Sequence, residues 1–94
     1  MNQSVIDHAG AVAIVRAAIE QIAPDIDAGM IPGDLDMRVE AELDSMDFMA
    51  VLAAIKDRTG VDVPESDVTR ASTIDGCAAC LVEHSATADR ADRP

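Results

Sequence analysis

One serine lies where a loop gives way to an amphipathic helix, within the run Glu42-Leu43-Asp44-Ser45-Met46-Asp47-Phe48. A hydroxyl at such a place is exposed, and the unpaired backbone N–H groups of the first helical turn favour an anion attached to it. The position of Ser45 therefore suits a covalent phosphodiester. The alternative is that Ser45 or Asp44 only caps the helix, as most serines and aspartates at helix starts do.

Two cysteines form a second candidate for chemistry, because Cys77 and Cys80 are spaced as Cys-x-x-Cys. The redox form of this motif follows a strand of a thioredoxin-like fold, and no strand is predicted before it. A structural zinc site needs four ligands, and His8 and His84 lack the paired spacing. The first turn of a helix could mildly acidify the Cys77 thiol. We interpret both cysteines as small buried side chains that fill gaps in the core and stay reduced.

The segment before Ser45 is rich in acidic residues, namely Asp25, Asp27, Asp34, Asp36, Glu40 and Glu42. They do not form the Asp-x-Asp-x-Asp-Gly pattern of an EF-hand, so we predict no specific metal site. The glycines of a nucleophile elbow are absent around Ser45, and the sequence therefore gives little support to a hydrolase triad.

The elements that position these residues are predicted to be helices. Apolar residues recur at three- and four-residue steps after Ser4, as one face of a helix requires, at Val5, Ala9, Val12, Val15, Ile19 and Ile22. This helix should end before Pro24, because a proline pushes the residue before it out of the α region. A long loop over 24–43 follows, with a short turn over 34–39, and loops of that length usually carry a role.

A second helix is predicted over 45–59, with Gly60 just past its end. We expect its buried face to comprise Met46, Met49, Leu52 or Ala53, and Ile55 or Thr59. Phe48 is assigned to neither the core nor the surface. A short extended link over 61–63 and a brief third helix over 64–67 come next.

A fourth helix is predicted from a cap at Thr73 to about His84, with inward-facing residues Ile74, Ala78, Leu81 and Val82. The segment 86–94 has no apolar period, and we predict a disordered C-terminal tail there.

Composition narrows the class of protein. The chain has 94 residues, 49% of them hydrophobic, yet Phe48 is its only aromatic residue, which favours helices with an aliphatic core. The 18 acidic and 7 basic residues give a formal charge of −11, which argues against binding to nucleic acid or anionic membranes and favours basic protein partners. No membrane-spanning stretch or signal sequence is visible, so we expect a cytoplasmic protein.

Three motifs in the same order resemble those of acyl carrier proteins. Asp44-Ser45-Met46-Asp47 resembles the family's Asp-Ser-Leu/Met-(Asp/Glu) signature, Gly60-Val61-Asp62-Val63-Pro64 its link between helices two and three, and Ala71-Ser72-Thr73-Ile74 the start of its last helix. The resemblance spans about 5–83. It implies an all-α, four-helix acyl-carrier bundle over residues 1–85, with a long loop after helix 1 and a short helix 3.

The resemblance also implies a role for each residue of the first motif. Ser45 would receive 4′-phosphopantetheine from coenzyme A through a phosphopantetheinyl transferase, and Asp44 would assist recognition by that enzyme. Met46, Asp47 and Phe48 would dock partner enzymes that load, transfer or condense acyl groups. The chain would then be a monomeric carrier of acyl thioesters and not itself an enzyme.

The predicted second helix departs from the family, because residues 50–58 lack the strongly acidic character of general fatty-acid carriers. We therefore predict a specialised carrier in fatty-acid or polyketide-like synthesis, with a more apolar docking face. Three alternatives stay open. They are an aminoacyl or peptidyl carrier, which usually has a Gly-Gly-(His/Asp)-Ser site, an adaptor that is never modified, and a small thiol-redox protein.

Overall fold

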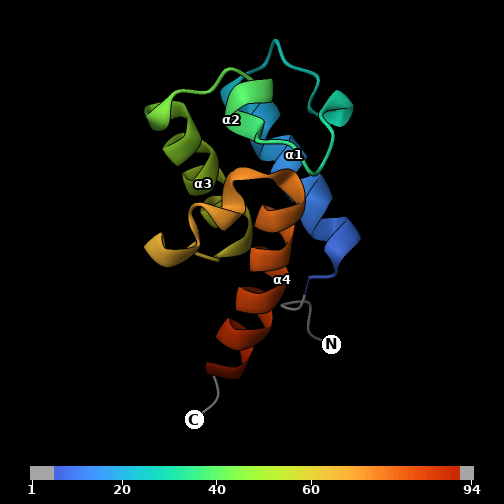
Figure 1. Ribbon diagram of the computed structural model, residues 1–94. Coiled ribbons are helices and arrows are strands. Elements are labelled where there is room, and N and C mark those ends of the chain that lie inside the picture. Colours follow the sequence, from blue (N-terminus) through green and yellow to red (C-terminus); the bar gives the residue numbers. More distant parts are fainter. Residues whose placement is uncertain (1–5, 92–94) are drawn as a thin grey trace.

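A computed structural model describes residues 6–91 of the chain. Within that range it contains four α-helices, namely α1 (His8–Ile22), α2 (Met37–Glu40), α3 (Ser45–Thr59) and α4 (Ile74–Ala91) (Figure 1). Three short 3₁₀ helices join them, η1 (Ala28–Met30), η2 (Glu65–Asp67) and η3 (Arg70–Ser72). The predicted all-α class is confirmed.

A capping side chain marks the start of helix α1, and a proline follows its end. Asp7 caps its start by accepting a hydrogen bond from the Gly10 N–H at 2.7 Å. Its last residue is Ile22, so the predicted end before Pro24 is confirmed. Ser4 and Val5 lie outside the described residues. Ala9, which we predicted to face inward, is exposed.

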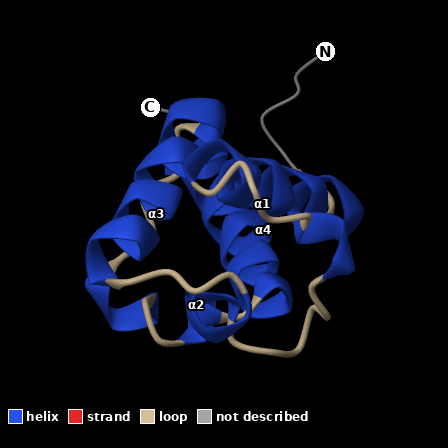
Figure 2. Cartoon of the chain, turned by 90° about the horizontal axis from the view of Figure 1, so that it is seen from above, coloured by secondary structure: helices blue, strands red, loops and turns tan. Residues whose placement is uncertain are grey.

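The bundle is built around α1, which packs against both α3 and α4. Figure 1 shows that α1 runs toward the end of the molecule that carries α2, whereas α3 and α4 run away from it. Seen from above, α1 and α4 lie next to each other and α3 lies to one side (Figure 2). The largest fully buried side chains are aliphatic or sulfur-containing: Val15, Ile19, Met37, Val51, Ile55, Ile74, Cys77, Cys80 and Leu81.

The loop between α1 and α2 is fastened to both α1 and α4. Arg16 of α1 donates through Nη1 to the Ile31 carbonyl at 2.9 Å and to the Ala28 carbonyl. The Asp75 N–H of α4 donates to the Gly33 carbonyl at 2.9 Å. These bonds hold α2 across one end of the bundle. The predicted turn over 34–39 proves to be the start of this short helix, which is capped by Asp36.

The predicted bounds of α3 are confirmed, and Gly60 follows it in the left-handed conformation at φ 77°. The brief third helix that we predicted over 64–67 proves to be η2, and a second 3₁₀ turn, η3, follows it.

Helix α4 is longer than predicted. Thr73 caps it as expected, because its Oγ1 accepts the Gly76 N–H at 2.9 Å. The helix continues to Ala91, so the predicted disordered tail over 86–94 is wrong for 86–91, and 92–94 lie outside the described residues. Ala86, Ala88 and Ala91 are strong helix formers, which explains the extension.

None of the helices in the described part has the length and apolarity needed to cross a bilayer.

Candidate functional site

Ser45 is the first residue of α3, and a reciprocal pair of carboxylates fixes the turn that presents it. Asp44 accepts the Asp47 N–H at 2.8 Å, and Asp47 Oδ2 accepts the Asp44 N–H at 3.5 Å, which together form a capping box. Two residues before Asp44, Glu42 takes a positive φ of 55°, which turns the chain from α2 into α3. The Ser45 side chain is exposed at the resulting corner.

The helix leaves backbone donors free beside that hydroxyl. The capping box uses the Asp47 N–H, and the Phe48 N–H donates to the Asp44 carbonyl at 2.9 Å. The N–H groups of Ser45 and Met46 belong to the first turn, where the helix itself offers no carbonyl to them. An anion on the Ser45 oxygen would therefore lie next to unpaired donors at the positive end of α3.

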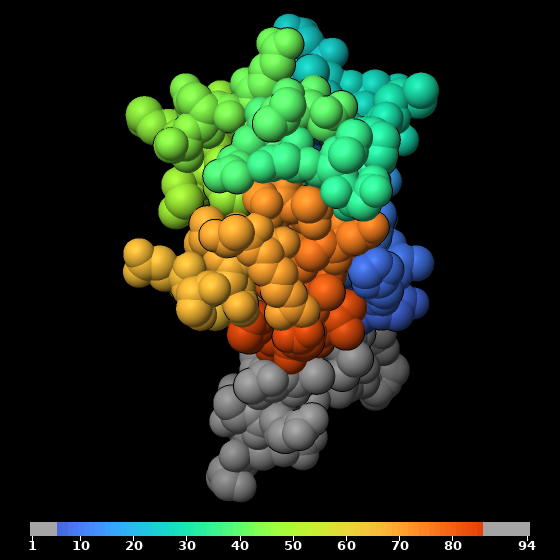
Figure 3. All heavy atoms as spheres, viewed as in Figure 1, coloured from blue at the N-terminus to red at the C-terminus, as the bar shows by residue number. Residues whose placement is uncertain are grey.

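A depression of about 620 Å³ adjoins Ser45. It lies between α3, α2 with its cap, and the segment after η2. Its lining includes Asp36, Arg38, Val39, Leu43, Asp44, Ser45, Phe48, Met49 and Val68. Figure 3 shows the start of α3 at the surface beside α2, with no described segment covering it. The Ser45 oxygen is thus open to an enzyme that would modify it.

The three residues expected to dock partners are placed differently. Met46 is 81% exposed beside Ser45, and Asp47 is half-buried in the capping box. Phe48 is only 3% exposed and belongs to the core, so its predicted place on a docking surface is wrong. The buried face predicted for α3 is also wrong for Met46 and Met49, since Met49 is 55% exposed, whereas Leu52 and Ile55 are buried as predicted.

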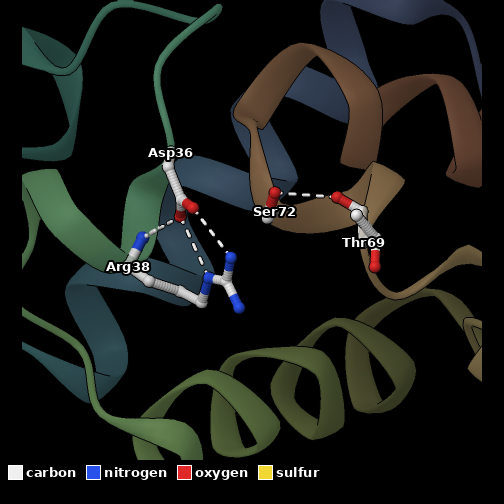
Figure 4. A network of polar contacts seen from close by, with 4 residues as sticks. All are labelled: Asp36, Arg38, Thr69 and Ser72. Carbon is white, nitrogen blue, oxygen red and sulfur yellow. Dashed lines mark hydrogen bonds and ion pairs between the residues drawn. The ribbon is translucent and has the colours of Figure 1, made fainter.

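An ordered ion pair that we did not predict from the sequence lies at the edge of the depression. Arg38 donates to Asp36 through Nε at 3.1 Å and through Nη2 at 2.8 Å (Figure 4). The same guanidinium lies 5.5 Å from the centroid of the Phe48 ring. The hydrogen bond from Arg38 holds the pKa of Asp36 below its ordinary value. An acid two residues before an arginine at a helix start is the only sequence signal for this pair.

The cysteines are buried and free, as we predicted, and the mild acidification that a helix start could give Cys77 does not occur. Burial, and secondly the neighbouring Cys80, raise the pKa of the Cys77 thiol to about 12. Burial also raises the pKa of Cys80. Thiols with raised pKa values are poor nucleophiles, which weighs against a redox role. Among the described residues, no group of three His, Cys, Asp or Glu side chains is arranged to hold a metal ion.

A protein-family model described as "Phosphopantetheine attachment site" matches residues 13–81, which include most of α1, all of α2 and α3, and the first part of α4. The chain belongs to this phosphopantetheine attachment family. Its domain carries a covalently attached 4′-phosphopantetheine and serves as a cofactor-bearing carrier rather than a catalyst. No curated protein and no solved structure matches the chain.

The residues around Ser45 fit a phosphopantetheine group. The hydroxyl is exposed, free N–H donors adjoin it, and the capping box holds the turn without using the serine side chain. The carboxylates of Asp44 and Asp47 each accept a hydrogen bond from the backbone N–H of the other residue. Their first role in this carrier is to fix the position of the serine.

Proposed function

We propose that this chain is an acyl carrier protein that bears its 4′-phosphopantetheine on Ser45. The observation that supports this proposal most strongly is an exposed hydroxyl at the first position of α3, inside the segment that matches the family. A phosphopantetheinyl transferase would join the Ser45 oxygen to the phosphate of the arm by breaking the pyrophosphate bond of coenzyme A, with adenosine 3′,5′-bisphosphate as the leaving group and loss of the serine hydroxyl proton. The terminal thiol of the arm would supply a thioester, which activates an acyl group for transfer or condensation.

The chain's own residues would orient the arm and present it to enzymes. The capping box keeps Ser45 at the corner of the bundle, and α2, fastened by the loop before it, forms one wall beside the serine. A flexible arm on a fixed corner raises the local concentration of its cargo at each active site that docks there. The partners we propose are the transferase and the enzymes that load, transfer or condense acyl groups.

The exposed face of α3 supports a specialised carrier in fatty-acid or polyketide-like synthesis. Met46, Met49 and Ala53 follow one another along this face at three- and four-residue steps, and all three are exposed. Exposed apolar side chains in such a row are typical of an interaction surface. A partner with a complementary apolar patch would distinguish this carrier from those that dock through acidic residues.

One experiment tests the attachment directly. The purified protein is incubated with coenzyme A and a broad-specificity phosphopantetheinyl transferase, with reductant present, and its intact mass is measured. The wild type should gain one cofactor mass and Ser45→Ala none. Ser66→Ala is the matched control, because Ser66 is also exposed and flanked by acids, Glu65 and Asp67. A wild type that gains no mass would favour the unmodified adaptor.

The docking face has its own test. Met46→Asp should slow modification by the transferase or acyl loading at least several-fold without lowering stability, because it puts a charge in an apolar contact. Met30→Asp is the control, since Met30 is 77% exposed but lies on η1, away from α3. Equal rates for both variants would contradict an apolar docking face.

A further inference from the structure

A phosphodiester on Ser45 would lie among carboxylates, because Asp44 and Asp47 flank the serine. Like charges at such short range repel one another unless a cation or hydrogen-bond donors offset them. Among the residues that line the depression, Arg38 is the only lysine or arginine. Beside the N–H groups of Ser45 and Met46, its guanidinium is therefore the one cationic group in the lining of the depression that can offset this negative charge.

The guanidinium of Arg38 is held in a defined orientation from two sides. Asp36 accepts Nε–H and Nη2–H on one edge, and Asp36 is itself fixed as the cap of α2 by accepting the Arg38 N–H at 2.8 Å. The ring of Phe48 lies 5.5 Å from the guanidinium carbon. A guanidinium that is already held in this way loses less conformational entropy on binding a further anion than a freely rotating side chain does.

Phe48 connects this guanidinium to Ser45. Ser45 and Phe48 are three positions apart on α3, so their side chains are neighbours on the helix surface. A guanidinium against the Phe48 ring is consequently close to the Ser45 corner, and both line the same depression.

The guanidinium also has donors to spare. Arginine has five N–H groups, of which Asp36 uses one on Nε and one on Nη2. Figure 4 shows the third nitrogen pointing away from Asp36, without an interaction drawn to the other labelled residues. Guanidinium donors on one edge suit the paired oxygens of a phosphate group.

We infer that Arg38, positioned by Asp36, binds the phosphate of the arm on Ser45 and so fixes where the arm leaves the protein. This inference rests on the proposed attachment and deepens it. The Asp36–Arg38 pair then serves as an anion-binding element: Asp36 orients the guanidinium, and the remaining N–H groups of Arg38 face the phosphodiester. The arm beyond the phosphate stays free to move.

The test compares the unmodified and modified forms of the wild type, Arg38→Gln and Arg38→Lys. Intact mass first shows that each form carries the group, so a failed attachment is recognised separately from a failed inference. The thermal midpoint of each form is then measured. Any damage that a substitution does to α2 is present in both forms and cancels in the difference between them.

The change in midpoint on modification should be more favourable by about 2–4 °C in the wild type than in Arg38→Gln. Arg38→Lys should restore part of this difference, because it keeps the charge without the fork. The difference should shrink as salt rises from about 0.01 M to about 1 M, over which the Debye length falls from ~30 Å to ~3 Å. The ³¹P resonance of the modified protein should shift in Arg38→Gln.

Arg58→Gln is the matched control. Arg58 is an exposed arginine at the other end of α3, where it donates to Gln21 at 3.0 Å. Its substitution should leave both the midpoint change on modification and the ³¹P resonance at their wild-type values. The inference is overturned if Arg38→Gln gives the same midpoint change and the same ³¹P resonance as the wild type.

Discussion

Asp44 and Asp47 fix the corner on which Ser45 lies, so the serine depends on its neighbours for its position. Each carboxylate accepts the other residue's backbone N–H, and both donors would otherwise be unpaired at the start of α3. The acids of the motif thus have a structural role that is independent of any partner. Substitution of Asp44 can separate this role from recognition by the transferase.

Asp44→Ala should lower the free energy of unfolding by ~1 kcal/mol, because it removes the helix cap, whereas Asp44→Asn should retain most of the stability. Urea unfolding followed by circular dichroism measures both. Asp57→Ala serves as the control, because Asp57 is exposed near the opposite end of α3 and should be neutral within ~0.5 kcal/mol. Equal stability of Asp44→Ala and the wild type would contradict the capping role.

If Asp44→Asn folds normally but is modified slowly, the carboxylate charge itself is read by the transferase. The same variant modified at the wild-type rate would limit Asp44 to its structural role.

At the scale of the elements, helix α3 shows what the sequence could and could not predict. Its ends follow from local signals, the cap at Asp44 and the left-handed Gly60, and both were predicted correctly. The rotation of the helix about its own axis was not predicted correctly, because apolar residues occur on more than one side of the helix. A row containing Met46 and Met49 satisfies the helical period as well as the observed row with Phe48, Val51 and Ile55.

Tertiary packing determines which of these two rows of side chains is buried. Phe48 is the bulkiest apolar side chain of α3, and burying it removes more apolar surface from water than burying either methionine. The contact of Arg38 with Phe48 could not be predicted for a similar reason, since it depends on how α2 lies against α3. Ser45 was found because its signal is local, namely a serine at a helix start between two acids.

The observed rotation of α3 has a measurable consequence. Phe48→Ala should lower the free energy of unfolding by about 3–5 kcal/mol, because it leaves a cavity in the core. Met49→Ala, at an exposed position, should change it by no more than ~0.5 kcal/mol. Urea unfolding of the two variants decides between the observed and the predicted faces. A larger loss for Met49→Ala than for Phe48→Ala would show that the helix is turned the other way.

At the scale of the whole molecule, α4 contributes sulfur as well as aliphatic side chains to the core around α1. Cys77 and Cys80 lie on the buried side of α4 with Ile74 and Leu81. A thiol in this place packs as a small apolar group and resists ionisation. The Cys-x-x-Cys spacing therefore belongs to the core of the bundle.

The raised pKa of Cys77 predicts a loss of stability in alkali. The folded protein keeps this thiol protonated up to about pH 12, whereas the unfolded chain releases the proton near 9.0, so the stabilisation is present below pH 9.0 and is lost as the pH rises toward 12. Between about pH 8 and about pH 10.5, the wild type should lose about 1–2 kcal/mol more than Cys77→Ala in urea unfolding. Parallel losses in the two proteins would contradict the burial of a protonated thiol.

Attachment of the arm at Ser45 is tested by fragmentation mass spectrometry of the intact modified protein. With reductant present to remove disulfide adducts of Cys77 and Cys80, we expect one cofactor mass, confined to fragments that contain Ser45. C-terminal fragments that begin after Ser45, and so contain Ser66 without Ser45, should have the unmodified mass. A cofactor mass on those fragments would show that the arm is attached elsewhere than at Ser45.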